Sequence, residues 1–132
     1  MKVLYARKAD GELQTLREHC ENVAAVARSR CQPLSNLLFL CGLLHDMGKA
    51  TEAFQRYLLL GGVRGEVEHS PHGAAWVWRR WRQGGAYAVL CAQWLCYAIA
   101  GHHSGLPDLL KDDGAPYARP ETPPEDLEQA EA

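Results

Sequence analysis

The chain lacks the segments that would carry a protein into or across a membrane. No apolar run reaches the roughly 20 residues of a membrane-spanning helix, and residues 1–8 hold no apolar stretch long enough for a signal peptide. The five cysteines include no C-x-x-C pair, which disfavours a cysteine zinc site and predicts reduced thiols. No Walker motif is present either, so an ATP-driven motor is not predicted on this chain. These absences predict a cytoplasmic protein with no membrane partner.

The charges and prolines of the chain are distributed unevenly. Residues 1–106 carry 12 Lys and Arg against 8 Asp and Glu, whereas residues 107–132 carry 2 against 8. Five of the seven prolines also lie in this last part. We therefore predict one mildly basic folded domain over residues 1–110, compatible with a polyanionic substrate. Residues 111–132 are expected to form a disordered, acidic, proline-rich tail or linker, irregular and poorly packed.

Apolar spacing within the first 110 residues predicts an all-α fold of about five helices. Residues 15–18 have the capping-box sequence T-L-R-E, which starts the first helix. A second helix, apolar on nearly all sides, is expected at the centre of the fold, with Gly48 as its C′ glycine. A short opening segment, residues 3–6, is predicted as a strand or an extended arm. The later helices are expected at roughly residues 34–46, 51–59, 70–81 and 86–100.

Aromatic residues follow helical spacing in the last two of these helices. The fifth helix places Leu90, Trp94 and Tyr97 on one face. We interpret the four tryptophans mostly as core residues, because such a stripe is more typical of packing than of base stacking.

A titratable pair, His45 and Asp46, ends the almost wholly apolar segment 37–44. Charge at the edge of a core is costly unless it is paired or bound to a metal. Imidazole with carboxylate suits Mn, Fe, Co, Ni or Zn, and Lys49 could hold a substrate phosphate as a point charge. Further candidate ligands fall near helix boundaries in other segments, and the whole set is His19, His45, Asp46, His69, His102 and His103.

Each of these residues also has a structural interpretation. A lone histidine beside an apolar stripe, such as His19, is more often a satisfied core residue. His45 and Asp46 could be a helix cap next to a surface carboxylate, and residues 102–103 could be a solvated turn. His72, in the first turn of the fourth helix, is interpreted as structural.

The ordered motifs resemble the HD superfamily of metal-dependent phosphohydrolases. More narrowly, they resemble the HD nuclease domain of the CRISPR-associated helicase-nuclease of type I interference systems. The residues that carry the resemblance are Glu18-His19, the sequence H-D-M-G-K at 45–49, His69-Ser70 with Gly73-Ala74, and the sequence G-H-H-S-G-L-P-D at 101–108.

This resemblance implies a compact helical HD fold, two divalent transition metals and cleavage of single-stranded DNA. The implied partners are a helicase domain or subunit and an RNA-guided surveillance complex. By position, one metal would be held by His19, His45 and a bridging Asp46, which would also be catalytic together with Lys49. The second metal would be held by His69, His102 and His103.

The family pattern contains a further aspartate beyond the double histidine, so we expect a shortened domain. The candidates in this chain are Asp108, Asp112, Asp113 and Asp126. Two alternative functions therefore stay open beside the nuclease. One is an HD phosphohydrolase acting on nucleotides, and the other is a non-catalytic HD domain that serves as an interaction module.

Overall fold

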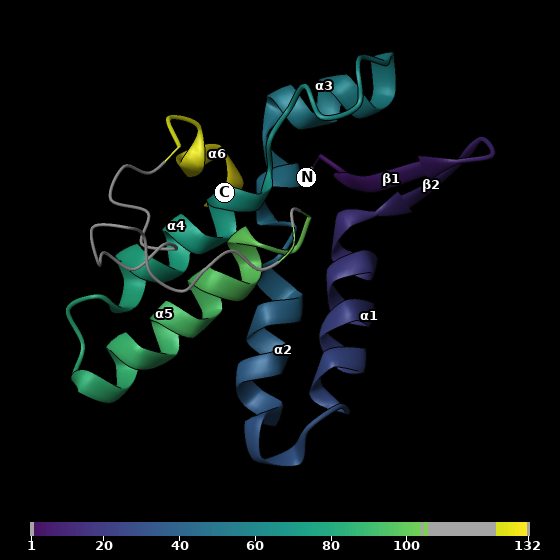
Figure 1. The fold of residues 1–132 in the computed structure, drawn as a ribbon. Helices are drawn as coiled ribbons and strands as arrows, with labels where there is room; N and C mark the ends of the chain where they lie inside the picture. The colour runs from purple at the N-terminus through teal and green to yellow at the C-terminus, as the bar shows by residue number, and fades with distance from the viewer. Residues whose placement is uncertain (1, 104, 106–123, 132) are drawn as a thin grey trace.

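Helices form most of the chain in the computed structural model, which describes residues 2–103, 105 and 124–131. Figure 1 shows a small hairpin at one end of α1, and two helix pairs that lie side by side. The elements are β1 (Tyr5–Ala9), β2 (Glu12–Thr15), α1 (Leu16–Arg28), η1 (Gln32–Leu34), α2 (Ser35–Leu44), η2 (Met47–Ala50), α3 (Glu52–Leu60), α4 (Ser70–Trp81), α5 (Ala86–Ala100) and α6 (Leu127–Glu131). The predicted all-α class is confirmed, with this hairpin added.

The opening strand is part of an antiparallel hairpin, β1–β2. Asp10 and Gly11 connect the strands with φ values of 51° and 83°, and such Asp-Gly pairs favour the tight turns of hairpins. The sequence analysis expected a strand or arm at residues 3–6 and no partner strand. The Asp-Gly pair was the signal for the partner.

The first two long helices pack closely along their length. Thr15 caps α1 by accepting a hydrogen bond from the backbone N–H of Glu18 at 3.2 Å, as the capping box predicts. At Gly42 of α2, an added Cβ would lie 2.7 Å from Cα of Ala24, so this crossing requires glycine. Helix α2 contacts α1 on one side and α5 on the other, which agrees with its expected central position (Figure 1).

Helix α2 ends two residues earlier than predicted, and Gly48 is not its C′ residue. The helix stops at Leu44, and Gly48 lies inside η2 without a positive φ. Gly48 is needed for space instead, because an added Cβ would lie 2.5 Å from Nδ1 of His72 and would collide with the backbone of His69. The turn η2 thus passes directly under the start of α4.

The three following helices agree closely with their predicted ranges. Helix α3 starts after Thr51, whose hydroxyl accepts a hydrogen bond from the N–H of Phe54. Helix α4 begins at Ser70 with His69 as its N-cap, one residue before the cap that the Ser-Pro pattern suggested. Helix α5 covers the predicted residues 86–100.

The main core forms where α4 packs against α5, through small side chains. Its buried members are Ala74, Val77, Ala92, Leu95, Cys96 and Ile99. The expected core face of α5 is wrong, because Leu90 is 49% and Trp94 58% exposed. The buried stripe of α5 is instead Ala92, Leu95, Cys96 and Ile99, which leaves Leu90 and Trp94 outside the contact. The other three tryptophans, all on α4, pack partly buried against this core.

The described end of the acidic tail is ordered against the domain. Leu127 of α6 is 2% exposed, and α6 contacts η2 and α4. Residues 124–131 therefore differ from the irregular segment expected from composition, because one apolar side chain and several polar contacts hold them. The remainder of the expected tail, residues 111–123, lies outside the described residues.

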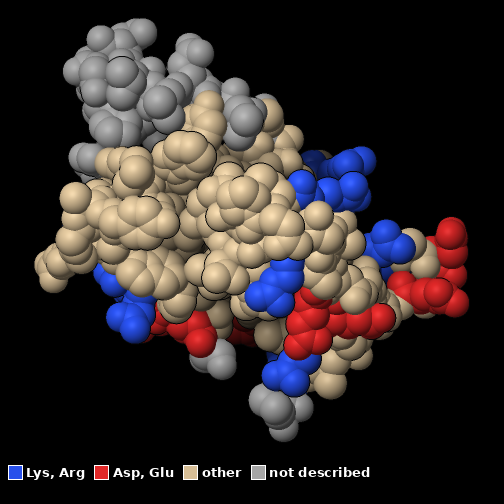
Figure 2. Space-filling model, turned by 90° about the horizontal axis from the view of Figure 1, so that it is seen from below, with Lys and Arg blue, Asp and Glu red and all other residues tan. Residues whose placement is uncertain are grey.

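Figure 2 views the molecule from the lower side of Figure 1, and the charged side chains on this face lie mainly toward its edges. Figure 2 shows a broad uncharged area at the centre of this face, with separate Lys and Arg groups around it. The described residues on this face therefore form no continuous basic stripe of the kind that tracks a nucleic-acid backbone. Among the described residues, none of the helices is long and apolar enough to cross a membrane.

Candidate metal centre

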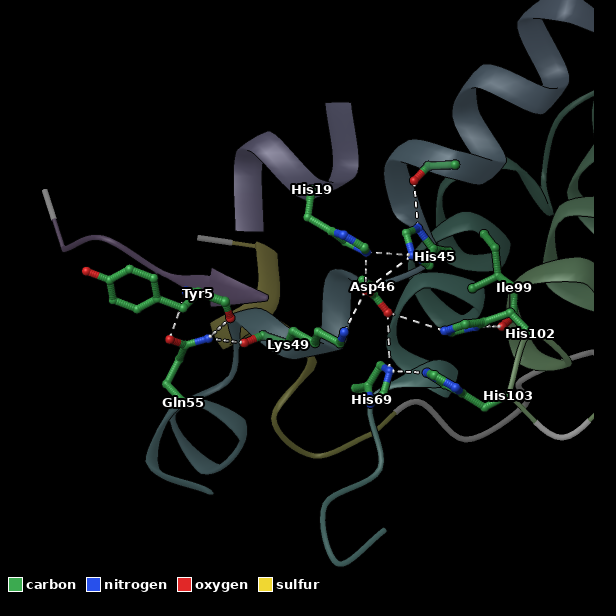
Figure 3. Close-up of polar contacts among 11 residues, drawn as sticks. Tyr5, His19, His45, Asp46, Lys49, Gln55, His69, Ile99, His102 and His103 are labelled. Atoms are coloured by element: carbon green, nitrogen blue, oxygen red, sulfur yellow. Dashed lines mark hydrogen bonds and ion pairs between the residues drawn. The ribbon is translucent and has the colours of Figure 1, made fainter. Parts of the chain in front are cut away.

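The centre of the site is the carboxylate of Asp46, which is 2% exposed. Asp46 follows the C-cap of α2 and precedes η2, so its backbone leaves the helix where α1, α4 and α5 also end or begin. Figure 3 shows the imidazoles of His19, His45, His69 and His102 and the ammonium of Lys49 directed at this carboxylate, with His103 behind His69. A buried carboxylate requires such partners to offset its lost hydration.

The first group of ligands faces Oδ2 of Asp46. Nε2 of His19, on α1, lies 2.9 Å from Oδ2, and Nε2 of His45 lies 3.2 Å from the same oxygen. The two Nε2 atoms are 3.3 Å apart. We call this set, with Oδ2, half-site 1.

The second group faces the other oxygen, Oδ1. Nε2 of His69 lies 3.2 Å from Oδ1 and Nε2 of His102 lies 3.3 Å from it. His103 reaches the group through His69, with their Nε2 atoms 2.6 Å apart. We call this set, with Oδ1, half-site 2. Asp46 is shared by both half-sites, one oxygen to each.

Backbone carbonyls orient two of the imidazoles. Nδ1 of His45 donates to the carbonyl of Gly42 at 2.7 Å, and Nδ1 of His102 donates to that of Ile99 at 2.5 Å. Both carbonyls lie three residues earlier, in the last turn of the preceding helix. With the proton on Nδ1, Nε2 of a neutral ring has the lone pair that a metal ligand needs. A ring that carries a second proton, on Nε2, donates it to Asp46 instead.

The ammonium of Lys49 contacts the same carboxylate oxygen that a metal in half-site 1 would use. Nζ of Lys49 lies 2.8 Å from Oδ2 of Asp46, while the backbone N–H of Lys49 donates to the carbonyl of Asp46 at 2.9 Å. The ammonium also lies 5.6 Å from the ring centre of Phe54. The side chain and backbone of Lys49 are thus both tied to Asp46.

Hydrogen bonds keep Asp46 ionised. Burial alone would raise the pKa of this carboxyl, but hydrogen bonds from His102, His45, His69 and Lys49 hold the pKa far below its ordinary range. Asp46 is therefore an anion throughout the range in which histidines titrate, and it can serve as a bridging ligand there.

The imidazoles differ in their proton affinity. Burial lowers the pKa of His19, and neighbouring Lys49 and His45 lower it further against the attraction of Asp46. Burial with the nearby His102 and His69 also lowers the pKa of His103. For His45, burial acts downward, but the contact with Asp46 and the carbonyl of Gly42 raise the pKa overall.

The donor set fits divalent transition metals. Within each half-site one ligand atom per residue lies within 4.8 Å of all the others. The donors are neutral imidazole nitrogens with one shared carboxylate, a combination that suits Mn, Fe, Co, Ni or Zn and not the oxygen-only sites of Mg or Ca. Each half-site could thus hold one cation, so that one cation would lie on each side of the Asp46 carboxylate.

All the residues that the sequence analysis singled out as ligands lie in this one cluster, together with Lys49. His72 stands apart: it is 3% exposed, and its Nε2 lies 2.6 Å from Oδ1 of Asp126. With Nε2–H donated, the bare Nδ1 faces Gly48 without a partner. Asp126 is thus bound to His72 and not to the cluster, and Asp108, Asp112 and Asp113 lie outside the described residues.

Two groups beside the centre were missed from the sequence. Thr51, fully buried, donates its hydroxyl to the carbonyl of Gly48 at 2.9 Å. Gln55, 4% exposed, bonds to Lys49 and Tyr5. Helical spacing gives no signal for buried polar residues of this kind, because both look like ordinary members of a first helical turn.

Fold and site together define a helical domain with a His/Asp centre for divalent metals. The family model described as the HD domain of Cas3 matches residues 5–132. The chain belongs to this family, the HD nuclease domains of CRISPR Cas3, as its motifs suggested. The match includes residues that the sequence analysis assigned to a tail. No curated protein matches the chain.

Proposed function

We propose that this chain is a metal-dependent nuclease domain that hydrolyses phosphodiester bonds of single-stranded DNA during CRISPR interference. One observation carries the proposal: each oxygen of Asp46 faces its own group of histidines. A carboxylate used in this way can bridge two cations and fix their spacing. Two adjacent metals are a common arrangement in enzymes that cleave phosphodiesters.

Each residue has a distinct part in this proposal. His19 and His45 would hold one metal, His69, His102 and His103 would hold the other, and Asp46 would contribute to both. When bound, the metals would lower the pKa of a coordinated water and neutralise charge on a phosphate oxygen. The Gly42 and Ile99 carbonyls keep two imidazoles in the ligand tautomer.

Lys49 supplies a fixed positive charge beside half-site 1. Its side chain is 13% exposed, close to the exposure of the histidines around it, so the ammonium can meet a substrate phosphate that reaches the site. We propose that the ammonium of Lys49, which contacts Oδ2 of Asp46, would also bind a phosphate oxygen of the substrate. As a point charge, an ammonium can bind phosphate in several orientations.

The partners proposed for this activity follow from the family. A helicase domain or subunit would deliver the single strand, and an RNA-guided surveillance complex would select the DNA. The uncharged centre of the face in Figure 2 lies at the end of the α1–α2 and α4–α5 pairs, away from the centre around Asp46. We place the path of the strand on the opposite end, over the two half-sites.

The test is cleavage of a labelled single-stranded oligonucleotide with added Mn²⁺, beside a panel of free nucleotides. The proposal expects cleavage of the strand, no comparable hydrolysis of nucleotides, and loss of cleavage in Asp46→Asn. Hydrolysis of nucleotides alone would indicate the phosphohydrolase alternative. A purified chain that binds metal at neither half-site and cleaves nothing would indicate an interaction module.

A further inference from the structure

A buried amide lies beside the metal centre without touching any of its ligands' side chains. Gln55 belongs to the first turn of α3 and is 4% exposed. We propose that Gln55 is a positioning residue, which fixes the turn η2 and thereby the ammonium of Lys49 beside Asp46. This inference rests on the proposed function in one respect, the use of Lys49 for a substrate phosphate.

The amide of Gln55 joins three separate segments. Its Oε1 accepts from the backbone N–H of Tyr5 at 3.0 Å, and its Nε2 donates to the carbonyl of Tyr5 at 2.7 Å. Nε2 also donates to the carbonyl of Lys49 at 2.8 Å. Figure 3 shows this amide between β1 and η2, on the side of Lys49 away from Asp46. Both donor hydrogens are therefore used on backbone carbonyls of different elements.

The bond to Lys49 falls where it constrains the direction of the side chain. The N–H of Lys49 is held by the carbonyl of Asp46, and its own carbonyl is held by Gln55. With both backbone groups fixed, the side chain leaves η2 toward Oδ2 of Asp46. Thr51, the N-cap of α3, donates its hydroxyl to the preceding carbonyl, that of Gly48. The first turn of α3 thus determines the conformation of η2.

The chemistry of the position requires an amide of this length. A methionine would fill the space but would leave the N–H of Tyr5 and two carbonyls without these bonds. A glutamate could still accept from the N–H of Tyr5, but it has no donor to offer either carbonyl, and its second oxygen would face both of them. A plain packing role for Gln55 would be met by methionine, whereas a positioning role would not.

The first arm of the test reads the position of Lys49 without using activity. Lys49 is acylated by an amine-reactive reagent, and its rate is followed by mass spectrometry in the parent, Gln55→Met and Gln129→Met. Gln129 is the matched control, because its Oε1 accepts from the backbone N–H of Glu52, at the start of α3, at 3.1 Å, and no hydrogen bond from its side chain to η2 is seen among the described residues. We expect acylation about threefold faster or more in Gln55→Met and unchanged in Gln129→Met, because the released turn exposes the amine more often.

The second arm is a double-mutant cycle on strand cleavage with Lys49→Met. We expect Gln55→Met to lower kcat about tenfold without lowering metal content, and to cause no further loss when Lys49 is already methionine. All variants are compared below the unfolding temperature of the least stable one. Equal acylation in both glutamine variants, or a further loss in the double variant, would overturn the proposal. If the parent cleaves nothing, the proposed function fails, and the acylation rates still decide the role of Gln55.

Discussion

The two half-sites use the same carboxylate but are built differently. Half-site 1 takes its histidines from the α1–α2 pair and shares Oδ2 with the ammonium of Lys49. Half-site 2 takes three histidines from the start of α4 and the end of α5, and no lysine or arginine is seen to contact Oδ1 among the described residues. Half-site 1 thus pairs metal binding with a cation, whereas half-site 2 is a ligand set alone. We therefore expect half-site 2 to bind its metal more tightly.

The largest effect is expected from removing the residue that both half-sites share. Asp46→Asn replaces two anionic oxygens with one neutral oxygen and an amide, so both metals should be lost. Strand cleavage should fall at least about 100-fold. Elemental analysis and a cleavage assay measure these losses, with circular dichroism as the control for the helical fold. Full metal content and full activity in Asp46→Asn would remove Asp46 from the site.

Removing one histidine from each half-site should separate the two metals. His19→Ala is expected to lose the metal of half-site 1 and His103→Ala that of half-site 2, leaving about one metal per chain in each case. Metal titration followed calorimetrically should then show one binding step instead of two. If either variant loses both metals, the half-sites do not bind independently.

Removing the competing cation should change the two half-sites in different ways. Lys49→Met takes away the charge next to Oδ2, so Mn²⁺ affinity at half-site 1 should rise about two- to fivefold. Affinity at half-site 2 should change less, and cleavage should nevertheless fall. Mn²⁺ titration with a parallel cleavage assay checks both outcomes, and an unchanged cleavage rate would exclude Lys49 from catalysis.

Acidity should also distinguish the half-sites. Metals bind neutral imidazole, so protons compete with metal at every histidine. The pKa of His45 is raised, whereas the pKa values of His19 and His103 are lowered. His45 should therefore be protonated before these two, and half-site 1 should lose its metal first as pH falls from about 8 to about 5. Metal content measured after equilibration across this range should fall in two steps. The step that is missing in His103→Ala belongs to half-site 2. If that step comes first as the pH falls, the expected order of metal loss is wrong.

The smallest effect is expected outside both half-sites. Asp126→Ala removes the partner of His72 and part of the attachment of α6. Because Asp126 is about one-third exposed, the free energy of unfolding should fall by only about 0.5–1 kcal/mol. Metal content should not change. Urea unfolding beside elemental analysis measures both, and a loss of metal would instead make Asp126 part of the centre.

The sequence predicted the helical ranges well, because local signals decide them. The capping box at Thr15 and the Ser-Pro pair that opens α4 mark helix starts, and the helix at residues 86–100 was found at its full length. The role of Gly48 was missed, since its requirement comes from α4 crossing η2 and not from local conformation. The exposed face of α5 was missed for the same reason: only packing decides which apolar stripe is buried.

In the candidate site, too, local sequence signals identify the residues, whereas tertiary packing decides how they are arranged. The histidines and Asp46 were singled out by residue type and motif, but their assignment to two oxygens of one carboxylate depends on tertiary geometry. Lys49 was recognised from its place in the motif. Gln55, which holds that lysine in η2, carried no sequence signal, because a buried amide is indistinguishable from a surface one until its partners are known. The roles of the histidines, Asp46 and Lys49 in metal binding and catalysis stay predictions.

The central claim is that Asp46 bridges two metals, one per oxygen. The most direct measurement is anomalous diffraction from crystals of the chain grown with Mn²⁺. The account predicts two anomalous peaks about 4 Å apart, one beside His19 and His45 and the other beside His69, His102 and His103. A single peak, or two peaks that do not flank the carboxylate of Asp46, would contradict it.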